Sequence, residues 1–152
     1  MPRSVVAVAS LVLLFAATTA FGAKPIREPV FFEDFVAEDV CPFPVLIETT
    51  ANREFVTIFS DGRVQVTGQL FARVTNLESG ESLDIHISGP ALIAPEERIF
   101  GRGLFILFPE DVTGPGLILT AGRIDVIRGE DGFIDDLVVR GHTGDLCEAL
   151  AA

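Results

Sequence analysis

Residues 83–88 read Leu-Asp-Ile-His-Ile-Ser, a strict alternation of apolar and polar side chains. Successive side chains of a β-strand point to opposite faces of the sheet. The three aliphatic residues therefore share one face, and Asp84, His86 and Ser88 share the other. This alternation predicts a strand with one buried face and one wet face.

Similar runs, rich in β-branched residues and phenylalanine, continue on both sides of this strand. Turn signals such as Ser60-Asp61-Gly62 and Gly141-His142-Thr143-Gly144 separate them. Helical periodicity is absent until Asp145–Ala151, where a short C-terminal helical turn is expected. We predict an all-β fold: a single antiparallel meander barrel of 7–8 strands, with a sandwich as the alternative. The strands are expected near 43–50, 54–60, 63–76, 82–89, 98–108, 117–128 and 133–140, with 90–95 as a short eighth.

The first 22 residues have the pattern of an export signal. Arg3 supplies the positive charge, Val5–Ala17 is the apolar core, and Ala20-Phe21-Gly22 places small residues before a cut at Ala23. The alternative is a membrane anchor, but this core is shorter than the span of about 20 residues that a bilayer needs. We therefore expect residues 1–22 to be a signal peptide. The mature protein would be secreted and extracellular, with no stable membrane insertion after cleavage.

Two regions make up the expected mature chain. Residues 23–40 carry two prolines, five acids and three phenylalanines, and they predict an extended acidic segment whose phenylalanines dock onto the sheet. Residues 41–152 form the predicted β-barrel domain, which is long enough to bury a core.

The two cysteines of the chain, Cys41 and Cys147, bracket this domain. In a secreted protein an even cysteine count predicts a disulfide, whereas two buried free thiols are the alternative. The bridge would tie the two ends of the domain together. It would also remove both thiols as nucleophiles.

Composition excludes several kinds of function. The mature chain has ten basic and 22 acidic residues, a net charge of −12, so neither nucleic acid nor an anionic membrane surface is an expected partner. Its single lysine, Lys24, lies at the predicted N-terminus, and the chain has neither tyrosine nor tryptophan. A Schiff-base lysine in the domain and a phenolic acid are therefore excluded.

Some predicted strands are apolar on both faces. Leu104–Phe108 has no polar position, whereas an antiparallel sheet with one wet face should alternate. Something should cover the outer face, and the N-terminal segment and a second subunit are equally good candidates. A homo-oligomer is one of these two expectations.

Candidate catalytic residues are few. His86 and Asp84 share the polar face of their strand, and a histidine near a carboxylate is a plausible general base if both line a cavity. Burial of one face only, which would leave both on the surface, is the commoner arrangement.

Arg123 and Asp125 lie on an otherwise apolar face of their predicted strand. They are candidates for a buried ion pair or a ligand anchor. The alternative is a strand end that leaves the core.

No nucleotide-binding, nucleophile or metal-ligand motif occurs in the chain. Glu130, Asp131, Asp135 and Asp136 could supply oxygen ligands to calcium, but they do not fit an EF-hand loop. We expect a solvated acidic turn there, no metal and no cofactor.

Several short motifs resemble those of small secreted actinobacterial proteins of unknown function. That family has a Cys-x-Phe-Pro-Val start, a Thr-Asn-x-x-Thr-Gly turn, in which Ser79 stands here for the second threonine, and a final Cys-x-x-Leu. The resemblance covers residues 40–151 and implies no activity. More loosely, the run of strands is similar to the allene-oxide-cyclase and dirigent-like barrels, which implies an eight-stranded, often oligomeric barrel for apolar small molecules. The motifs are Asp39–Val45, Phe59–Arg63, Thr67-Gly68, Thr75–Ser82, Ser88–Pro90, Ala121–Arg123 and Asp145–Ala151.

The sequence leaves three functions open. The first is a non-catalytic barrel that binds a small apolar ligand or an extracellular partner. The second is a structural or adhesive surface protein. The third is a cyclase or isomerase in which Asp84, His86 or Arg123 assists proton transfer.

Overall fold

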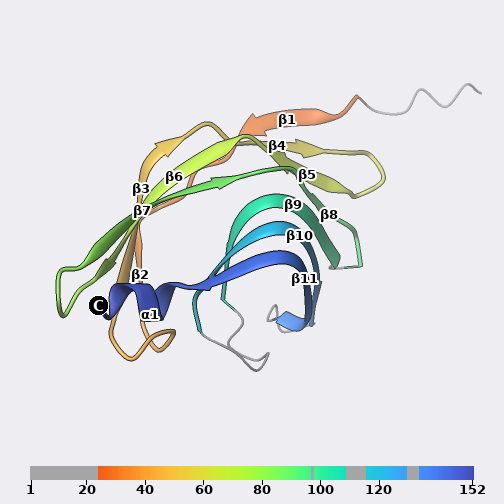
Figure 1. Cartoon of the computed structure of the whole chain (residues 1–152). Coiled ribbons are helices and arrows are strands. Elements are labelled where there is room, and N and C mark those ends of the chain that lie inside the picture. Colours follow the sequence, from red (N-terminus) through yellow and green to blue (C-terminus); the bar gives the residue numbers. More distant parts are fainter. Residues whose placement is uncertain (1–23, 97, 109–115, 130–133) are drawn as a thin grey trace, which may run out of the picture.

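One antiparallel sheet contains all the strands of the computed structural model, which describes residues 24–96, 98–108, 116–129 and 134–152 (Figure 1). The short helix α1 (Leu146–Leu150) follows the last strand. The all-β class and the C-terminal helical turn are therefore confirmed. The strands are β1 (Ile26–Pro29), β2 (Phe35–Ala37), β3 (Val45–Asn52), β4 (Phe55–Ile58), β5 (Val64–Thr67), β6 (Gln69–Asn76), β7 (Ser82–Ser88), β8 (Ala91–Ile93), β9 (Arg98–Leu107), β10 (Ile118–Arg128) and β11 (Ile134–Asp145).

Neighbouring elements join into long strands that follow one another as a meander. β3 pairs with β6 and β4 pairs with β5, so β3 and β4 are two halves of one strand, as are β5 and β6. β7 and β8 likewise pair with β6 and β5, and both then pair with β9. β10 and β11 complete the meander, and β1 and β2 add to its first edge.

The sheet does not close into the predicted barrel. Among the described residues β11 pairs only with β10, and β1 and β2 form the opposite edge. Closure requires the first and last strands to meet with a matching stagger. The local pattern of apolar residues and turns contains no information on that stagger, so the prediction of a barrel was wrong.

A row of glycines crosses the sheet where the strands break or bend. Gly103 lies directly opposite Gly122, which lies directly opposite Gly141. Gly89 continues the row, since a Cβ added to Gly103 would lie 2.8 Å from its Cα. On the next strand Gln69 pairs with Ser88. Gly68, which precedes Gln69, therefore lies beside Gly89, which follows Ser88, and also belongs to the row. We call this row the glycine crease; its members are Gly68, Gly89, Gly103, Gly122 and Gly141.

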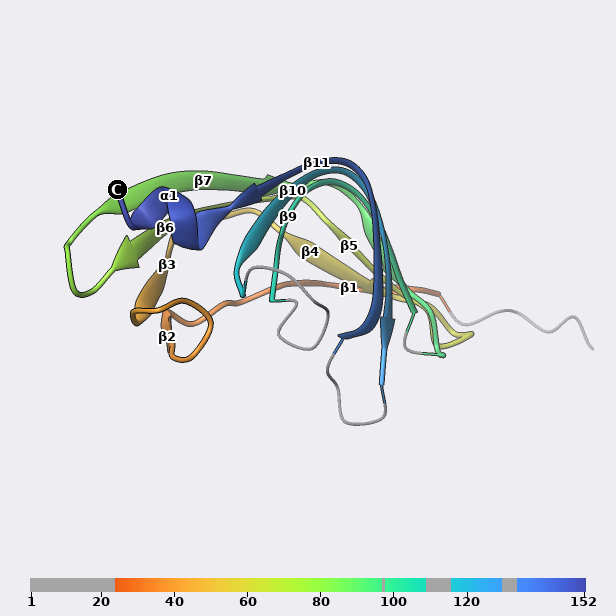
Figure 2. The same ribbon diagram turned by 60° about the horizontal axis from the view of Figure 1, so that its bottom comes forward.

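The backbone at the crease suits only glycine. Gly122 and Gly141 have φ values of 141° and 153°, a region that side chains with a Cβ rarely adopt. A Cβ on Gly141 would also lie 2.0 Å from the carbonyl oxygen of Ala121. The glycines with this backbone conformation lie opposite one another on neighbouring strands. The strands therefore bend along one line across the sheet. Figures 1 and 2 show β9, β10 and β11 arching over together.

The bend gives the sheet an open, U-shaped form with a concave and a convex face, which we call the gutter. Among the described residues β7 and β9 pair at Ser88 and Leu104 alone, and Figure 1 shows β9–β11 turning away from β7. Side-chain alternation then sorts the two faces as expected. On β7 the side chain of Ile85 is buried and that of Asp84 is exposed, so the aliphatic face of residues 83–88 lies on the concave side.

Helix α1 fills one end of the gutter. Asp145 caps it by accepting a hydrogen bond from the backbone N–H of Glu148 at 3.1 Å. Leu146 and Leu150 are buried in the core. The side-chain amide of Asn76 on β6 donates to the Leu150 carbonyl at 3.1 Å. The helix thus contacts strands far from it in sequence.

The predicted disulfide is confirmed. Cys41 precedes β3 and Cys147 lies in α1, with their Cα atoms 5.4 Å apart. The bridge closes a loop with a sequence separation of 106 residues. It therefore fastens the first part of the meander to the helix that follows its last strand.

The N-terminal part of the chain is described from residue 24 onward. The predicted signal peptide, residues 1–22, lies outside the described residues. In the acidic segment, β1 and β2 pair with β4 and β3, while the ring of Phe31 remains 84% exposed. Backbone pairing therefore holds this segment more than the Phe31 side chain does. The described residues contain no helix with the length and apolar character that crossing a membrane requires.

The predicted turn at residues 141–144 lies inside strand β11. Gly141 belongs to the crease, and His142 is an exposed strand residue opposite Ala121. A glycine that permits a sharp bend within a strand gives the same local signal as a glycine in a turn.

Replacement of a crease glycine should destabilise the fold far more than replacement of an ordinary strand glycine. We expect Gly141→Ala to lower the free energy of unfolding by about 2 kcal/mol or more, because it combines a positive φ with a clash against backbone. Gly144→Ala, in the same strand, is the matched control, since an added Cβ there meets nothing within 4 Å. Chemical denaturation measures both; equal effects would contradict the assigned role of the crease.

Reduction of the disulfide should lower the melting temperature without changing the β-sheet content. A loop of about 100 residues corresponds to about 4.7 kcal/mol in the chain-entropy model, which is an upper expectation. Thermal melts followed by circular dichroism, with and without reductant, measure the effect. The Cys41→Ser/Cys147→Ser double variant should melt at the same temperature with or without reductant. An unchanged melt of the reduced wild-type protein would contradict a stabilising bridge.

Candidate functional site

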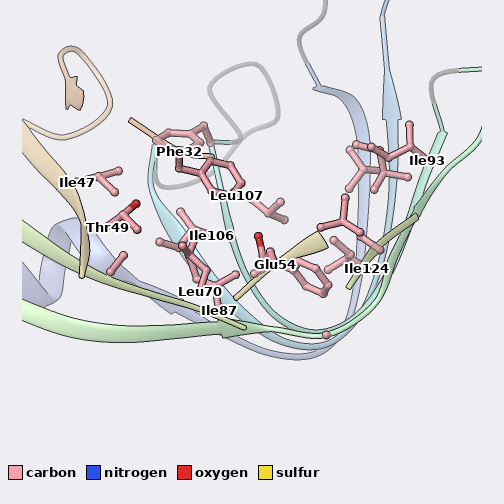
Figure 3. Close-up of a pocket in the computed structure, with 18 of the residues that line it drawn as sticks. Phe32, Ile47, Thr49, Glu54, Leu70, Ile87, Ile93, Ile106, Leu107 and Ile124 are labelled. Carbon is pink, nitrogen blue, oxygen red and sulfur yellow. The ribbon is translucent and has the colours of Figure 1, made fainter. Parts of the chain in front are cut away.

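The concave face of the gutter holds a cavity of about 550 Å³. Figure 3 shows aliphatic side chains converging on it from opposite walls, with Ile47 on one side and Ile93 on the other. The walls come from both sides of the glycine crease. A volume of this size falls within the range of small-molecule sites, about 300–1,000 Å³.

Strand alternation explains the apolar lining. Every second residue of a strand faces the concave side, and most of these positions hold aliphatic residues; Thr49 is polar, and on β9 the consecutive residues 105–107 all line the cavity. Examples on the lining are Ile47, Leu70, Ala72, Ile87, Ile124 and Val126.

Phenylalanines close part of the cavity. Phe105 on β9 lines it, as do Phe32 and Phe35 of the N-terminal segment. The ring centroids of Phe35 and Phe108 are 6.2 Å apart, so β2 contacts the residue that directly follows β9. Phe32 and Phe35 remain about half exposed. The N-terminal segment therefore forms a partial cover over the cavity.

One carboxylate projects into this apolar surface. Glu54, between β3 and β4, is 7% exposed and lines the cavity, where Figure 3 shows it between the two walls. Its position follows from the crease, because a Cβ on Gly68 would lie 2.6 Å from the Glu54 Cα. Glu54 thus lies next to Gly68 in the glycine crease, at the position on its own strand that glycines hold on the later strands.

The backbone of Glu54 is held on both sides. Its N–H donates to the side-chain oxygen of Asn52 at 2.8 Å. Its carbonyl accepts from the N–H of Val30 at 3.1 Å. The Asn52 amide in turn donates to the Val30 carbonyl at 2.7 Å. This network of hydrogen bonds joins Val30 of the N-terminal segment to the bend. It also fixes the position of the Glu54 backbone, from which the side chain extends.

The Glu54 carboxylate itself has no hydrogen-bond or ion-pair partner among the described residues. Burial raises its pKa above the ordinary value of 4.5, since an apolar environment disfavours the charged form. In the described part of the chain two other ionisable residues line the cavity, Glu33 and Arg128, and both are exposed. Within the described residues, the cavity therefore combines an apolar wall with one largely buried acid that has no partner among them.

The residues proposed from the sequence as an acid–base pair lie on the other face of the sheet. His86 stacks on Phe71 with ring centroids 4.5 Å apart and is not among the cavity-lining residues. Its Nε2 atom is buried and has no hydrogen-bond partner within the described ranges. Asp84 is bound by Arg73, whose Nε and Nη2 donate to its oxygens at 2.8 and 3.2 Å.

Arg73 lowers the pKa of the Asp84 carboxyl through these hydrogen bonds. Asp84 therefore remains ionised and committed to an ion pair on the convex surface. The structure does not bring Asp84 and His86 to the cavity.

Arg123 and Asp125 also face away from the cavity. Asp125 accepts hydrogen bonds from Arg98 at 2.9 and 2.7 Å, and these bonds lower its pKa. Arg123 is exposed and lies opposite Arg102 on one side and Arg140 on the other. The two candidates therefore do not pair with each other; Asp125 belongs to an ion pair with Arg98, and Arg123 to a row of arginines.

The acidic turn considered for calcium lies only partly within the described residues. Glu130 and Asp131 lie outside them, whereas Asp135 and Asp136 are exposed on β11. In the part of the chain that the structure describes, no three His, Cys, Asp or Glu side chains group so as to hold a metal ion.

Comparisons of the chain with protein-family models, curated proteins and solved structures found no match. The resemblance to small secreted actinobacterial proteins and to cyclase-like barrels therefore remains a prediction. The cavity itself is the basis for assigning a function.

Sequence reasoning did not identify Glu54 as a site residue. It lies at the start of a predicted strand, directly after Arg53, where an acidic residue is ordinarily solvated. Its burial follows from the bend of the strands around it. The one local signal is Asn52, whose side chain holds the backbone of Glu54 and Val30, but such turns are common.

Replacing Glu54 with glutamine should stabilise the protein at neutral pH. A carboxyl whose pKa is raised by folding holds its proton in the folded state at pH values where the unfolded chain has lost it, so stability falls as pH rises through that window. Glu54→Gln removes this loss, so above the window the variant should be more stable than the wild type. Denaturant titrations from acidic to neutral pH measure it.

The matched control is Glu28→Gln, which removes an exposed acid from β1. It should leave the pH dependence of stability close to that of the wild type. If Glu54→Gln and Glu28→Gln give the same pH profile, the Glu54 carboxyl is not the buried acid that the structure shows.

Proposed function

We propose that this is a secreted, non-catalytic protein that binds a small apolar ligand in the concave cavity. The observation that carries the proposal is the cavity of about 550 Å³ with aliphatic and aromatic walls and few polar groups. Small-molecule sites have this character, with a few polar groups that orient the ligand.

Two further observations support the proposal. The disulfide and α1 hold one end of the gutter, and the crease holds its bend. The walls are therefore preformed, which reduces the conformational entropy that a ligand must overcome on binding. The disulfide is also compatible with an extracellular location.

The cyclase or isomerase alternative receives less support. It requires Asp84, His86 or Arg123 to assist proton transfer in a cavity, and these side chains lie on the convex face. The structural or adhesive alternative has no specific observation in its favour. Ligand binding is therefore the function that the geometry supports best.

The protein should bind a neutral hydrophobic dye such as Nile red in this cavity. Ala91 on β8 lines the cavity and is half-buried, so Ala91→Phe should occupy part of the space and weaken dye binding by about tenfold or more, the loss expected when roughly 1.4 kcal/mol of contact is removed. Fluorescence titration measures the dissociation constant.

Ala51→Phe is the matched control, because it adds the same ring at an exposed position of β3. It should bind the dye as the wild type does. Circular dichroism melts check that both variants fold. Absence of dye binding by the wild-type protein, or equal binding by the folded Ala91→Phe variant, would contradict the proposal.

A further inference from the structure

We propose that the cavity selects apolar molecules that carry an amine, and that Glu54 is the group that binds the ammonium. This inference rests on the proposed ligand-binding function and specifies the ligand class. It concerns the carboxylate that the structure places, without a partner among the described residues, on an apolar wall.

Glu54 is 7% exposed as a residue, although its carboxylate oxygens are not fully closed off from the cavity, and an acid that has lost part of its water without gaining a partner is disfavoured. A charge removed from water is strongly disfavoured unless a partner and hydrogen bonds compensate for it. The described residues provide neither to the Glu54 carboxylate. A ligand that brings its own hydrogen-bond donors and a positive charge would supply both, whereas a pure hydrocarbon would bury the acid further.

The Glu54 carboxylate also discriminates between ligand head groups. An alcohol can donate one hydrogen bond to a carboxylate, but it brings no charge. An ammonium donates charge-assisted hydrogen bonds, which are shorter and roughly twice as strong as those between neutral groups. A carboxylic acid ligand would place a second negative charge next to Glu54 in an apolar site, where like charges disfavour each other's ionisation.

The charge of the whole protein acts in the same direction. The chain carries a formal net charge of −11, and a negative surface attracts cations and repels anions before contact. Among the described residues Arg128 is the single basic side chain on the cavity lining, and it is exposed. The balance of charge around the cavity therefore also favours a cationic ligand.

Glu54 couples this selection to pH. Protons and the ligand ammonium compete for the carboxylate, so the preference for an amine over an alcohol should grow as pH rises and Glu54 ionises. The other acidic group on the described lining is Glu33, which is exposed on the segment before β2. A Glu33→Gln variant separates its contribution from that of Glu54.

The test is competition against Nile red by decylamine, decanol and decanoate, which share one chain length and differ in head group. Isothermal titration calorimetry gives the same affinities directly. For the wild-type protein at neutral pH, decylamine should bind at least about tenfold more tightly than decanol. Decanoate should bind more weakly than decanol. The difference between amine and alcohol should shrink on acidification.

Variants assign the effect to one residue. Glu54→Gln should still bind the dye and decanol, while its preference for decylamine falls to within about twofold and loses its pH dependence. Glu28→Gln makes the same change of charge at an exposed position of β1 and should keep the wild-type preference. If Glu33→Gln abolishes the preference while Glu54→Gln retains it, the anchor is Glu33 and the inference is wrong.

The outcomes separate this inference from the proposed function. If the wild-type protein binds neither the dye nor any of the three compounds, the proposed function fails. If it binds the dye and decanol but does not prefer decylamine, or prefers decanoate, ligand binding stands and the assignment of an amine to Glu54 is overturned.

Discussion

The whole architecture depends on a backbone constraint at the glycine crease. On neighbouring strands the chain adopts φ values near 140° and brings carbonyl oxygens so close that a Cβ could not be accommodated. Such positions on one strand would produce an isolated bulge. Because the glycines lie side by side in the register, their bends add into a single fold line across the sheet.

The crease explains why an open sheet can enclose a cavity. A flat sheet would expose its apolar face, which soluble proteins avoid over large areas. Bending brings the two halves of each long strand toward each other, so the aliphatic side chains of the concave face partly shield one another. The disulfide and α1 secure one end of the gutter. The N-terminal segment, with Phe32 and Phe35, partly covers the opening.

Local patterns in the sequence predicted the features that depend on local chemistry. The alternation in residues 83–88 correctly assigned the two faces of β7, and the cysteine pair correctly predicted the disulfide. The closed barrel was wrong because closure depends on the stagger between the first and last strands. The turn assigned to residues 141–144 was wrong because Gly141 serves the crease. Glu54 was missed because its burial comes from neighbours distant in sequence.

The position of Glu54 bears on why the cavity is not purely hydrophobic. A leucine or glutamine there would avoid the desolvation of a charge, and proteins readily accept substitutions that remove such a cost. Natural proteins retain strained or destabilising groups mainly at functional sites. The crease places Glu54 on the inner wall, and Asn52 and Val30 hold its backbone there by hydrogen bonds. An acid whose backbone is held on the wall of an apolar cavity, and whose carboxylate has no partner among the described residues, is better suited to recognising a ligand than to stabilising the fold.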